Sequence, residues 1–196
     1  MSIYLEQDKR ERLYRWDEYF LGLCNAVANK SPCMSRKIGA ILVRDHSILS
    51  TGYNGPPRGI SHCGAERLDK DADLRELLEY TEEQGLLEYD PLKHCPRRCL
   101  GYPSGKGLEL CPAGHAERNC IVNAARVGVA IRNSSLYLNT CIPCKDCMIE
   151  LINAGVIEIV VTILEEYDRE SKRLLSESGI ILRKFSCLSG VDEKND

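Results

Sequence analysis

Two short segments of the sequence together hold the side chains of a metal site. His115 and Glu117 stand in "GHAERN", and Cys144 and Cys147 stand in the later segment "IPCKDC". One imidazole and two thiolates suit zinc, and three protein ligands leave the fourth position of the ion open to water. A Cys-x-x-Cys pair that opens a helix can turn both sulfurs to one point, where the helix N-terminus favours their negative charge. The pattern therefore predicts a fold that brings the starts of two helices together around one ion.

Glu117 distinguishes a catalytic site from a structural one. It lies in the same predicted first helical turn as His115, close enough to reach a water on the metal. A carboxylate there can take a proton from the water and return it to a nitrogen of the substrate. The alternative is a closed structural site with Cys120 or Cys141 as fourth ligand and Glu117 on the surface. The glutamate favours catalysis, because a purely structural site has no use for it.

The hydrophobic pattern predicts strands alternating with helices. Apolar residues recur every three or four positions within 15–31, which predicts a helix. Residues 38–55 predict two strands joined by a tight turn at Asp45-His46. The later elements are predicted as helix 113–128, strand 135–139, helix 145–154, strand 157–162, helix 168–178 and strand 180–185. Such alternation indicates an α/β domain whose later strands run parallel.

We expect one domain over residues 1–196. The chain has 196 residues, 43% of them hydrophobic, which is enough for one sizeable core. The charged segment 64–94 shows helical spacing and predicts a helical insertion on the surface, whereas the polar tail 188–196 is expected to be loose. The N-terminal segment is charged and no apolar run has the length of a membrane span, so we expect a soluble, cytoplasmic protein without membrane contact.

The composition argues against a nucleic-acid partner. A net charge of −3 offers no broad basic surface, and two Phe and one Trp provide few aromatic rings for stacking on bases. One small phosphate can still bind locally. Eleven cysteines, an odd number, in a chain expected in the cytoplasm indicate reduced thiols, several of them on metal, rather than a disulfide framework.

With these motifs in place, the chain resembles the cytidine deaminase superfamily and, more narrowly, the deoxycytidylate (dCMP) deaminases. His-x-Glu followed by Pro-Cys-x-x-Cys is the signature of zinc-dependent nucleobase deaminases. Further stretches similar to the family are "CMSRKIGAILVRDHSILSTGYNGPPRG" (33–59), "CPRRCLGYPSGKGLELCPAGHAERNCI" (95–121) and "AGVIEIVV" (154–161) with "EYDRESKRLLSESGI" (166–180). The insertion at 64–94 is longer than the family pattern. The resemblance implies a three-layer α/β/α fold, with a mixed five-stranded sheet and helices on both faces.

The resemblance also implies an activity, the hydrolytic deamination of dCMP to dUMP and ammonia, which feeds thymidylate synthesis. It implies that His115, Cys144 and Cys147 hold the catalytic zinc and that Glu117 protonates N3 and then the departing ammonia. The residues implied to bind the substrate are Ser35, Arg36, Lys37, Asn54, Ala116 and Tyr167.

Two kinds of contact are implied within this set, each with an alternative. Asn54 corresponds to a family position at the sugar, although an Asn-Gly turn residue with left-handed backbone is the alternative. The candidates for the 5′-phosphate are Ser35, Arg36, Lys37 and Tyr167, with Arg58 as a further option. The alternative for each of them is a solvated surface side chain.

Four other cysteines imply a second, structural zinc ion, because each lies in a segment similar to a family stretch that carries cysteine. They are Cys33, Cys63, Cys95 and Cys111. Four thiolates close the tetrahedron and leave no open position. His94 or Cys99 could replace one of the four, and buried free thiols that act as small hydrophobic residues are the alternative.

Regulation and assembly are implied by the resemblance alone. Family members are often homohexamers that dCTP and dTTP regulate with a divalent ion, so we expect a homo-oligomer and Mg²⁺ bound with a nucleotide effector. The loop of Gly52, Tyr53 and Gly55 is the expected effector site. Alternative activities are deamination of a modified dCMP, of the pyrimidine of riboflavin synthesis or of tRNA adenosine, and the non-enzymatic alternative is a catalytically silent zinc-binding protein.

Overall fold

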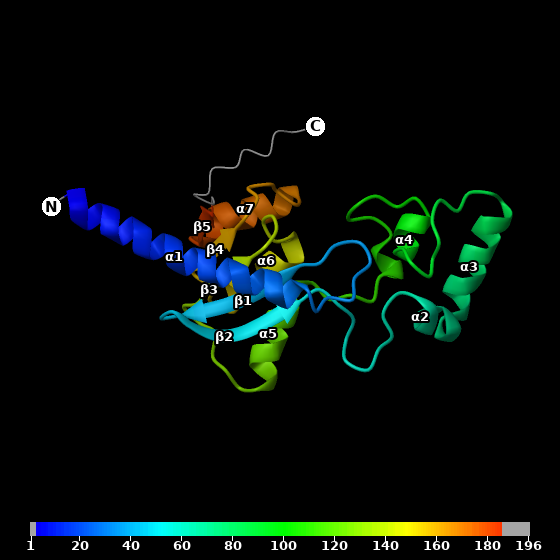
Figure 1. Cartoon of the computed structure of the whole chain (residues 1–196), viewed down its shortest axis with the longest axis horizontal. Helices are drawn as coiled ribbons and strands as arrows, with labels where there is room; N and C mark the ends of the chain where they lie inside the picture. Colours follow the sequence, from blue (N-terminus) through cyan, green and yellow to red (C-terminus); the bar gives the residue numbers. More distant parts are fainter. Residues whose placement is uncertain (1–2, 186–196) are drawn as a thin grey trace.

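The computed structural model describes residues 3–185, in which one mixed five-stranded sheet lies between helices (Figure 1). Strand β1 (Gly39–Arg44) is antiparallel to both of its neighbours, β2 (Ser47–Tyr53) and β3 (Ser135–Leu138). Strands β4 (Glu158–Val161) and β5 (Ile181–Lys184) continue the sheet in parallel, in the order β2-β1-β3-β4-β5. The prediction of parallel later strands is confirmed. The tail 188–196 and Cys187 lie outside the described residues.

The first two strands form the predicted hairpin. Asp45 and His46 have φ values of 51° and 57°, so both central residues of the two-residue loop are left-handed. This is the backbone of a type I′ turn, whose twist matches that of the flanking strands. The hairpin therefore holds β1 in the middle of the sheet, where its backbone also pairs with β3.

Helices cover both faces of the sheet, as predicted. Ile41 and Val43 contact the single helix α1 (Ile3–Ala28) on one face. Ala40 and Leu42 point to the opposite face, as the alternation along a strand requires. The helices on that opposite face are α5 (Ala116–Arg126), α6 (Lys145–Asn153) and α7 (Arg169–Ser178). The result is a three-layer α/β/α arrangement.

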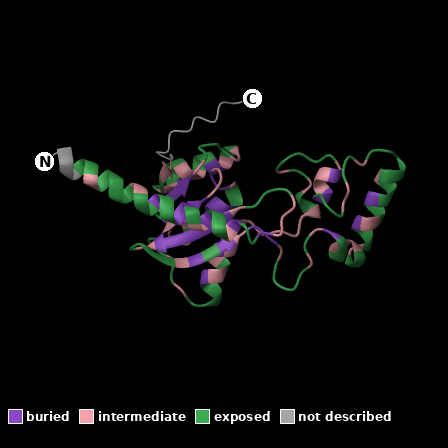
Figure 2. Cartoon of the chain, viewed as in Figure 1, coloured by how far each residue is buried: buried purple, intermediate pink, exposed green. Residues whose placement is uncertain are grey.

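Helix α1 begins at Ile3, well before the predicted start at residue 15. Its N-terminal part extends beyond the sheet and is exposed (Figure 2). Charged side chains pair along it, as in the Asp8–Arg12 ion pair one turn apart. Apolar residues recur with the helical period only where α1 covers the sheet. The sequence pattern therefore predicted that part of the helix and missed its N-terminal part. Within residues 3–185, no helix is both long and apolar enough to cross a bilayer.

An ionic cluster around the buried Asp17, with Arg183 and Glu158 half-buried, ties α1 to three strands. The carboxylate of Asp17 in α1 accepts a hydrogen bond of 2.8 Å from the hydroxyl of Tyr137 in β3. Arg183 in β5 donates to both oxygens of Asp17, at 2.6 and 3.0 Å, and to Glu158 in β4 at 2.6 Å. The four side chains satisfy one another, so helix α1 is held on the sheet by charge as well as by apolar contact.

Residues 64–110, here called the insertion lobe, project to one side of the sheet (Figure 1). The elements of the lobe are α2 (Ala65–Lys70), α3 (Ala72–Glu83), α4 (Pro96–Cys99) and the 3₁₀ helix η1 (Leu108–Leu110). Leu74 and Leu78, one turn apart on α3, are buried with Cys99 of α4. The lobe thus has a small core of its own, and α4 belongs to it although the predicted insertion ended at residue 94.

Candidate active site

His115, Cys144 and Cys147 meet at the N-terminal ends of two helices. His115 directly precedes α5, and Cys144 directly precedes α6, which carries Cys147 in its first turn. The sulfurs of Cys144 and Cys147 lie 3.4 and 3.3 Å from Nδ1 of His115. Tetrahedral zinc, with bonds of about 2.1 Å to nitrogen and about 2.3 Å to sulfur, would place these atoms about 3.6 Å apart. The three side chains therefore fit a zinc ion.

The ligand set has three members rather than four. In the part of the chain that the structure describes, these three residues form the one group whose metal-ligating atoms all lie within 4.8 Å of one another. Cys120 and Cys141, the alternatives for a fourth ligand, are outside this group. The arrangement matches the three-ligand pattern of catalytic zinc rather than a closed structural site.

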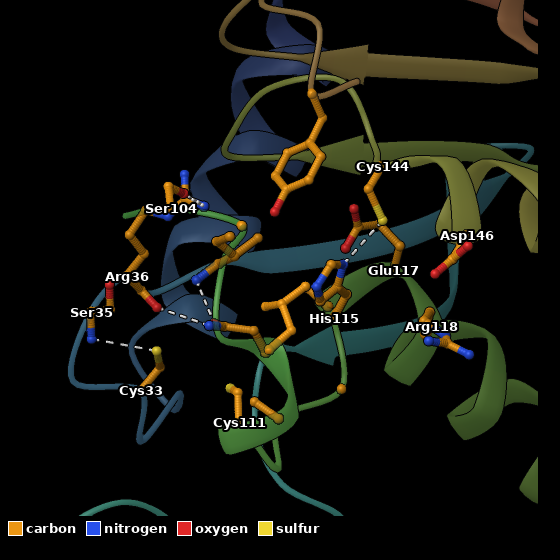
Figure 3. Close-up of a pocket in the computed structure, with 18 of the residues that line it drawn as sticks. Cys33, Ser35, Arg36, Ser104, Cys111, His115, Glu117, Arg118, Cys144 and Asp146 are labelled. Carbon is orange, nitrogen blue, oxygen red and sulfur yellow. Dashed lines mark hydrogen bonds between the residues drawn. The ribbon is translucent and has the colours of Figure 1, made fainter. Parts of the chain in front are cut away.

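Glu117 lies beside the metal ligands and is 6% exposed. Figure 3 shows its carboxylate next to the side chains of His115 and Cys144. Burial raises the pKa of Glu117, since a carboxylate loses hydration there. A buried carboxyl group beside the open side of a metal site is placed to accept and donate a proton.

The thiol pair at the start of α6 favours a thiolate. A hydrogen bond from Cys147, with a second one from His115, lowers the pKa of Cys144 to about 4. The thiolate is the form that binds a metal ion. Cys144 thus supplies negative charge to the ligand set.

A cavity of about 640 Å³ opens in front of the metal ligands. Its volume is within the range of small-molecule sites. His115, Glu117 and Cys144 line one side, and Figure 3 shows Ser35, Arg36 and Ser104 across the cavity from them. The cavity therefore has a metal-ligand end and an opposite end with basic and hydroxyl groups.

Asn54 lines this cavity and is 9% exposed. Its side-chain oxygen accepts from the backbone N–H of Ile38 at 2.8 Å, and its amide nitrogen donates to the carbonyl of Arg36 at 2.9 Å. Asn54 does not adopt a positive φ, so the alternative of a left-handed turn residue is wrong. These two hydrogen bonds hold the segment before β1. The amide of Asn54 keeps one further N–H donor and one further acceptor site on its oxygen.

The other predicted substrate residues divide into two groups. Those that line the cavity are Ser35, Arg36, Ala116 and Tyr167. Lys37 does not line it, and Ile38 does instead. In the extended chain that enters β1, successive side chains point to opposite sides, so Arg36 and Ile38 share the cavity side and Lys37 faces solvent. A substrate contact of Lys37 stays a prediction. Arg58 bonds to Asn123 away from the cavity wall.

The loop after β2 is fastened to the start of α5. Gly55 and Gly114 exchange backbone hydrogen bonds of 3.1 and 2.8 Å. The side chain of Asn119 donates to the carbonyl of Tyr53 at 2.8 Å. A Cβ on Gly52 would lie 2.3 Å from backbone atoms of α5, so glycine allows this helix to approach β2 closely. The loop predicted as an effector site thus positions Asn54 and His115 relative to each other.

Of the four cysteines predicted to bind a structural zinc ion, two are in contact. A hydrogen bond from the thiol of Cys63 lowers the pKa of Cys95 to about 5. Cys33 and Cys111 line the cavity, and the sulfur of Cys33 accepts from the backbone N–H of Ser35 at 3.4 Å. Sulfurs on one zinc ion would lie about 3.8 Å apart. Over residues 3–185, no three of these cysteines come within 4.8 Å of one another.

The cavity wall also includes charged residues beyond those predicted to bind metal or substrate. They are Arg97, Arg98, Arg118, Lys145, Asp146, Asp168, Arg169 and Glu170. Asp168 caps α7 and also accepts from the backbone N–H of Lys145, so it joins the starts of α6 and α7. The adjacent arginines in "CPRRC" were the available sequence signal, but only the fold turns the insertion lobe toward the cavity.

Comparison with known proteins relates most of the chain to one family. Residues 14–163 match the family described as "Cytidine and deoxycytidylate deaminase zinc-binding region". The deoxycytidylate deaminase of Mycobacterium phage D29 is 34% identical over 161 residues, which are 80% of this chain and 96% of the phage protein. The deoxycytidylate deaminase of Schizosaccharomyces pombe is 32% identical over 170 residues, which are 87% of this chain and 44% of the yeast protein. The chain thus spans less than half the length of the yeast relative.

A solved structure supports the fold. The dCMP deaminase of cyanophage S-TIM5, in complex with dCMP and dUMP, aligns with a TM-score of 0.57 at 22% identity. The alignment covers 94% of this chain and 98% of the phage chain. This likeness confirms the predicted α/β/α fold with its mixed sheet.

Proposed function

Because the chain belongs to the cytidine and deoxycytidylate deaminase family, we propose that it catalyses the hydrolytic deamination of dCMP to dUMP and ammonia. The observation that carries this proposal is the buried Glu117 beside the three-ligand group of His115, Cys144 and Cys147. A closed structural metal site has no role for this carboxylate. In a cell, the reaction would supply dUMP for thymidylate synthesis.

Each side chain at the metal-ligand end has a distinct role in the proposed reaction. His115, Cys144 and Cys147 would hold a zinc ion, which supplies the Lewis acidity that makes water a strong nucleophile near neutral pH. Glu117 takes a proton from the attacking water and delivers it to N3 of the cytosine ring. The same carboxylate then takes the second proton of that water from the hydroxyl now on C4 and delivers it to the amino group, so that the C4–N bond breaks, the C4 carbonyl forms and ammonia leaves. Burial keeps this proton exchange away from bulk water.

The rest of the cavity would orient the nucleotide. Asn54 offers its remaining donor and acceptor to the sugar, and Ala116, fully buried, forms part of the wall next to Glu117. Ser35, Arg36 and Tyr167 are the candidates for the phosphate among the residues selected from the sequence. Burial raises the pKa of Tyr167, so its hydroxyl stays protonated and can donate a hydrogen bond.

Ammonia release from a panel of substrates tests the proposal. We expect turnover of dCMP well above that of cytidine, dCTP and deoxyadenosine, because the cavity can hold a pyrimidine at the metal and a phosphate at the opposite end. The same panel includes a 5-substituted dCMP. Faster ammonia release from it than from dCMP would indicate that the natural substrate carries a modified base. Faster release from an adenosine substrate, or no release from any of them by zinc-loaded protein, would contradict the proposal.

A second zinc ion is also part of the proposal, bound by Cys63 and Cys95 together with Cys33 and Cys111. The contact between Cys63 and Cys95 supports it. Metal analysis of the purified protein is expected to give two zinc ions per chain, falling to one in Cys95→Ser and staying at two in the control Cys141→Ser. One zinc ion per chain in the parent protein would remove this second site.

The family suggests regulation and assembly as well. We propose a homo-oligomer, as a hexamer, in which dCTP with Mg²⁺ activates and dTTP inhibits through the Gly52–Gly55 loop. The support is that this loop contains Asn54 and is hydrogen-bonded to Gly114 and to Asn119 at the start of α5. A sigmoidal dCMP rate curve that dCTP makes hyperbolic is the expected observation, and an unresponsive hyperbola would argue against regulation.

A further inference from the structure

Three guanidinium groups gather at the end of the cavity opposite the metal ligands. Arg36 comes from the segment before β1, whereas Arg97 and Arg98 are neighbours on α4 of the insertion lobe. Both arginines of α4 are half-buried. Tyr167 lines the same cavity as Arg36 and Arg97. The chain has a net charge of −3, so this is a local concentration of positive charge rather than a general property of the surface.

None of these arginines has a counter-charge. Across residues 3–185, the ion pairs do not include Arg36, Arg97 or Arg98. The carboxylates on the same wall are used elsewhere: Asp168 accepts two backbone N–H groups, and Glu170 pairs with Arg173. Arg36 is exposed, whereas Arg97 and Arg98 are half-buried, and a partly desolvated guanidinium group without a counter-charge is stabilised by an anionic ligand.

The three side chains are held in place by neutral partners and keep donors free. Arg97 donates to the carbonyls of Lys106 and Pro103, at 2.7 and 3.4 Å. Arg98 donates to the carbonyl of Tyr102 at 3.0 Å and to the hydroxyl of Ser35 at 3.5 Å. A guanidinium group has five N–H donors. These hydrogen bonds therefore orient each arginine and leave some of its N–H groups free to bind a ligand.

The same residues connect the lobe to the α/β domain. Arg36 donates to the hydroxyl of Ser104 in the lobe at 3.1 Å, and Arg98 reaches back to Ser35. Position Gly105 lies against the hydroxyl of Tyr167, where a Cβ would be 3.2 Å away. An anion placed between these groups would bond to both parts of the molecule at once.

We propose that Arg97 and Arg98 of the insertion lobe, with Arg36, form a site for the 5′-phosphate and make the protein select nucleotides over nucleosides. The proposal rests on the proposed function, since it assigns the phosphate end of the same cavity. A phosphate monoester carries close to two negative charges at neutral pH, and guanidinium forks match its oxygens in geometry. The lobe thereby contributes directly to recognition of the substrate.

Binding measurements on the zinc-loaded full chain carrying Glu117→Gln test this without turnover. Calorimetry with dCMP and with deoxycytidine compares the ligand with and without its phosphate. We expect dCMP to bind more tightly than deoxycytidine, and Arg97→Gln or Arg98→Gln to weaken dCMP about 10- to 100-fold, as for a charge-assisted hydrogen bond. The affinity for deoxycytidine should stay within about twofold, because no phosphate contact is lost. In the Glu117→Gln protein, inorganic phosphate should compete with dCMP, and this competition should disappear when Arg97→Gln or Arg98→Gln is added.

Lys93→Gln is the matched control, because it removes one positive charge from the lobe at an exposed side chain paired with Asp90. Added to the Glu117→Gln protein, it should leave the dCMP affinity unchanged. If the arginine variants bind dCMP as the control does, or if dCMP and deoxycytidine bind equally to the Glu117→Gln protein, the phosphate site is wrong. If dCMP binds through these arginines but the parent protein releases no ammonia, the deaminase proposal fails and the phosphate site stands.

Discussion

Replacing Glu117 by glutamine is expected to lower the rate of ammonia release from dCMP by about 10²- to 10⁴-fold, the usual contribution of general acid–base catalysis. Glutamine has nearly the same shape but cannot exchange a proton, so the proposed transfers from water to N3 and to the leaving amine are lost. His115, Cys144 and Cys147 are unchanged, so the variant should bind zinc as the parent does. Initial rates with dCMP, with zinc content measured on the same samples, check both statements.

Glu18→Gln is a suitable control, because this glutamate is exposed on α1, on the opposite face of the sheet. It should match the parent in rate and in zinc content. A Glu117→Gln variant with a rate near that of the parent would exclude the proton-transfer role. A variant that lost its zinc would instead assign Glu117 to holding the ion.

Removing the carboxylate of Asp17 is expected to have the largest effect on stability. Asp17→Ala leaves Arg183 with Glu158 alone and leaves the hydroxyl of Tyr137 without its partner. Loss of one partner of a fully buried ion pair costs about 3 to 5 kcal/mol. Arg183 and Glu158 are half-buried here, so we expect about 2 to 4 kcal/mol. For a chain of this size, the midpoint of thermal unfolding should fall by roughly 10 °C. Thermal and urea unfolding followed by circular dichroism measure the change.

Asp8→Ala provides the comparison on the same helix, because Asp8 and Arg12 form an exposed ion pair. Exposed pairs contribute between about 0 and 1 kcal/mol, so this variant should unfold close to the parent. Equal midpoints for the two variants would show that the cluster around Asp17 does not stabilise the fold.

Much of the layered domain could be predicted from the sequence. The apolar periods located the helices that lie on the sheet, and the Asp45-His46 turn matched the observed hairpin. Each of these signals is local, since a side chain that faces the core must recur with the period of its own element. The early start of α1 was missed for the same reason, because its N-terminal part contacts no core and carries no apolar period.

By itself, the sequence determined the chemistry of the metal-ligand end. His115 and Glu117 stand at a fixed spacing at the start of one helix, and Cys144 and Cys147 stand at a fixed spacing at the start of another. Only the tertiary structure decided the opposite end of the cavity. There Ile38 rather than Lys37 lines the wall, and arginines of the insertion lobe line the same cavity as Arg36. The physical reason is that local backbone geometry sets which residues within one helical turn share a face. Contacts between separate segments depend instead on how the lobe and the sheet pack against each other.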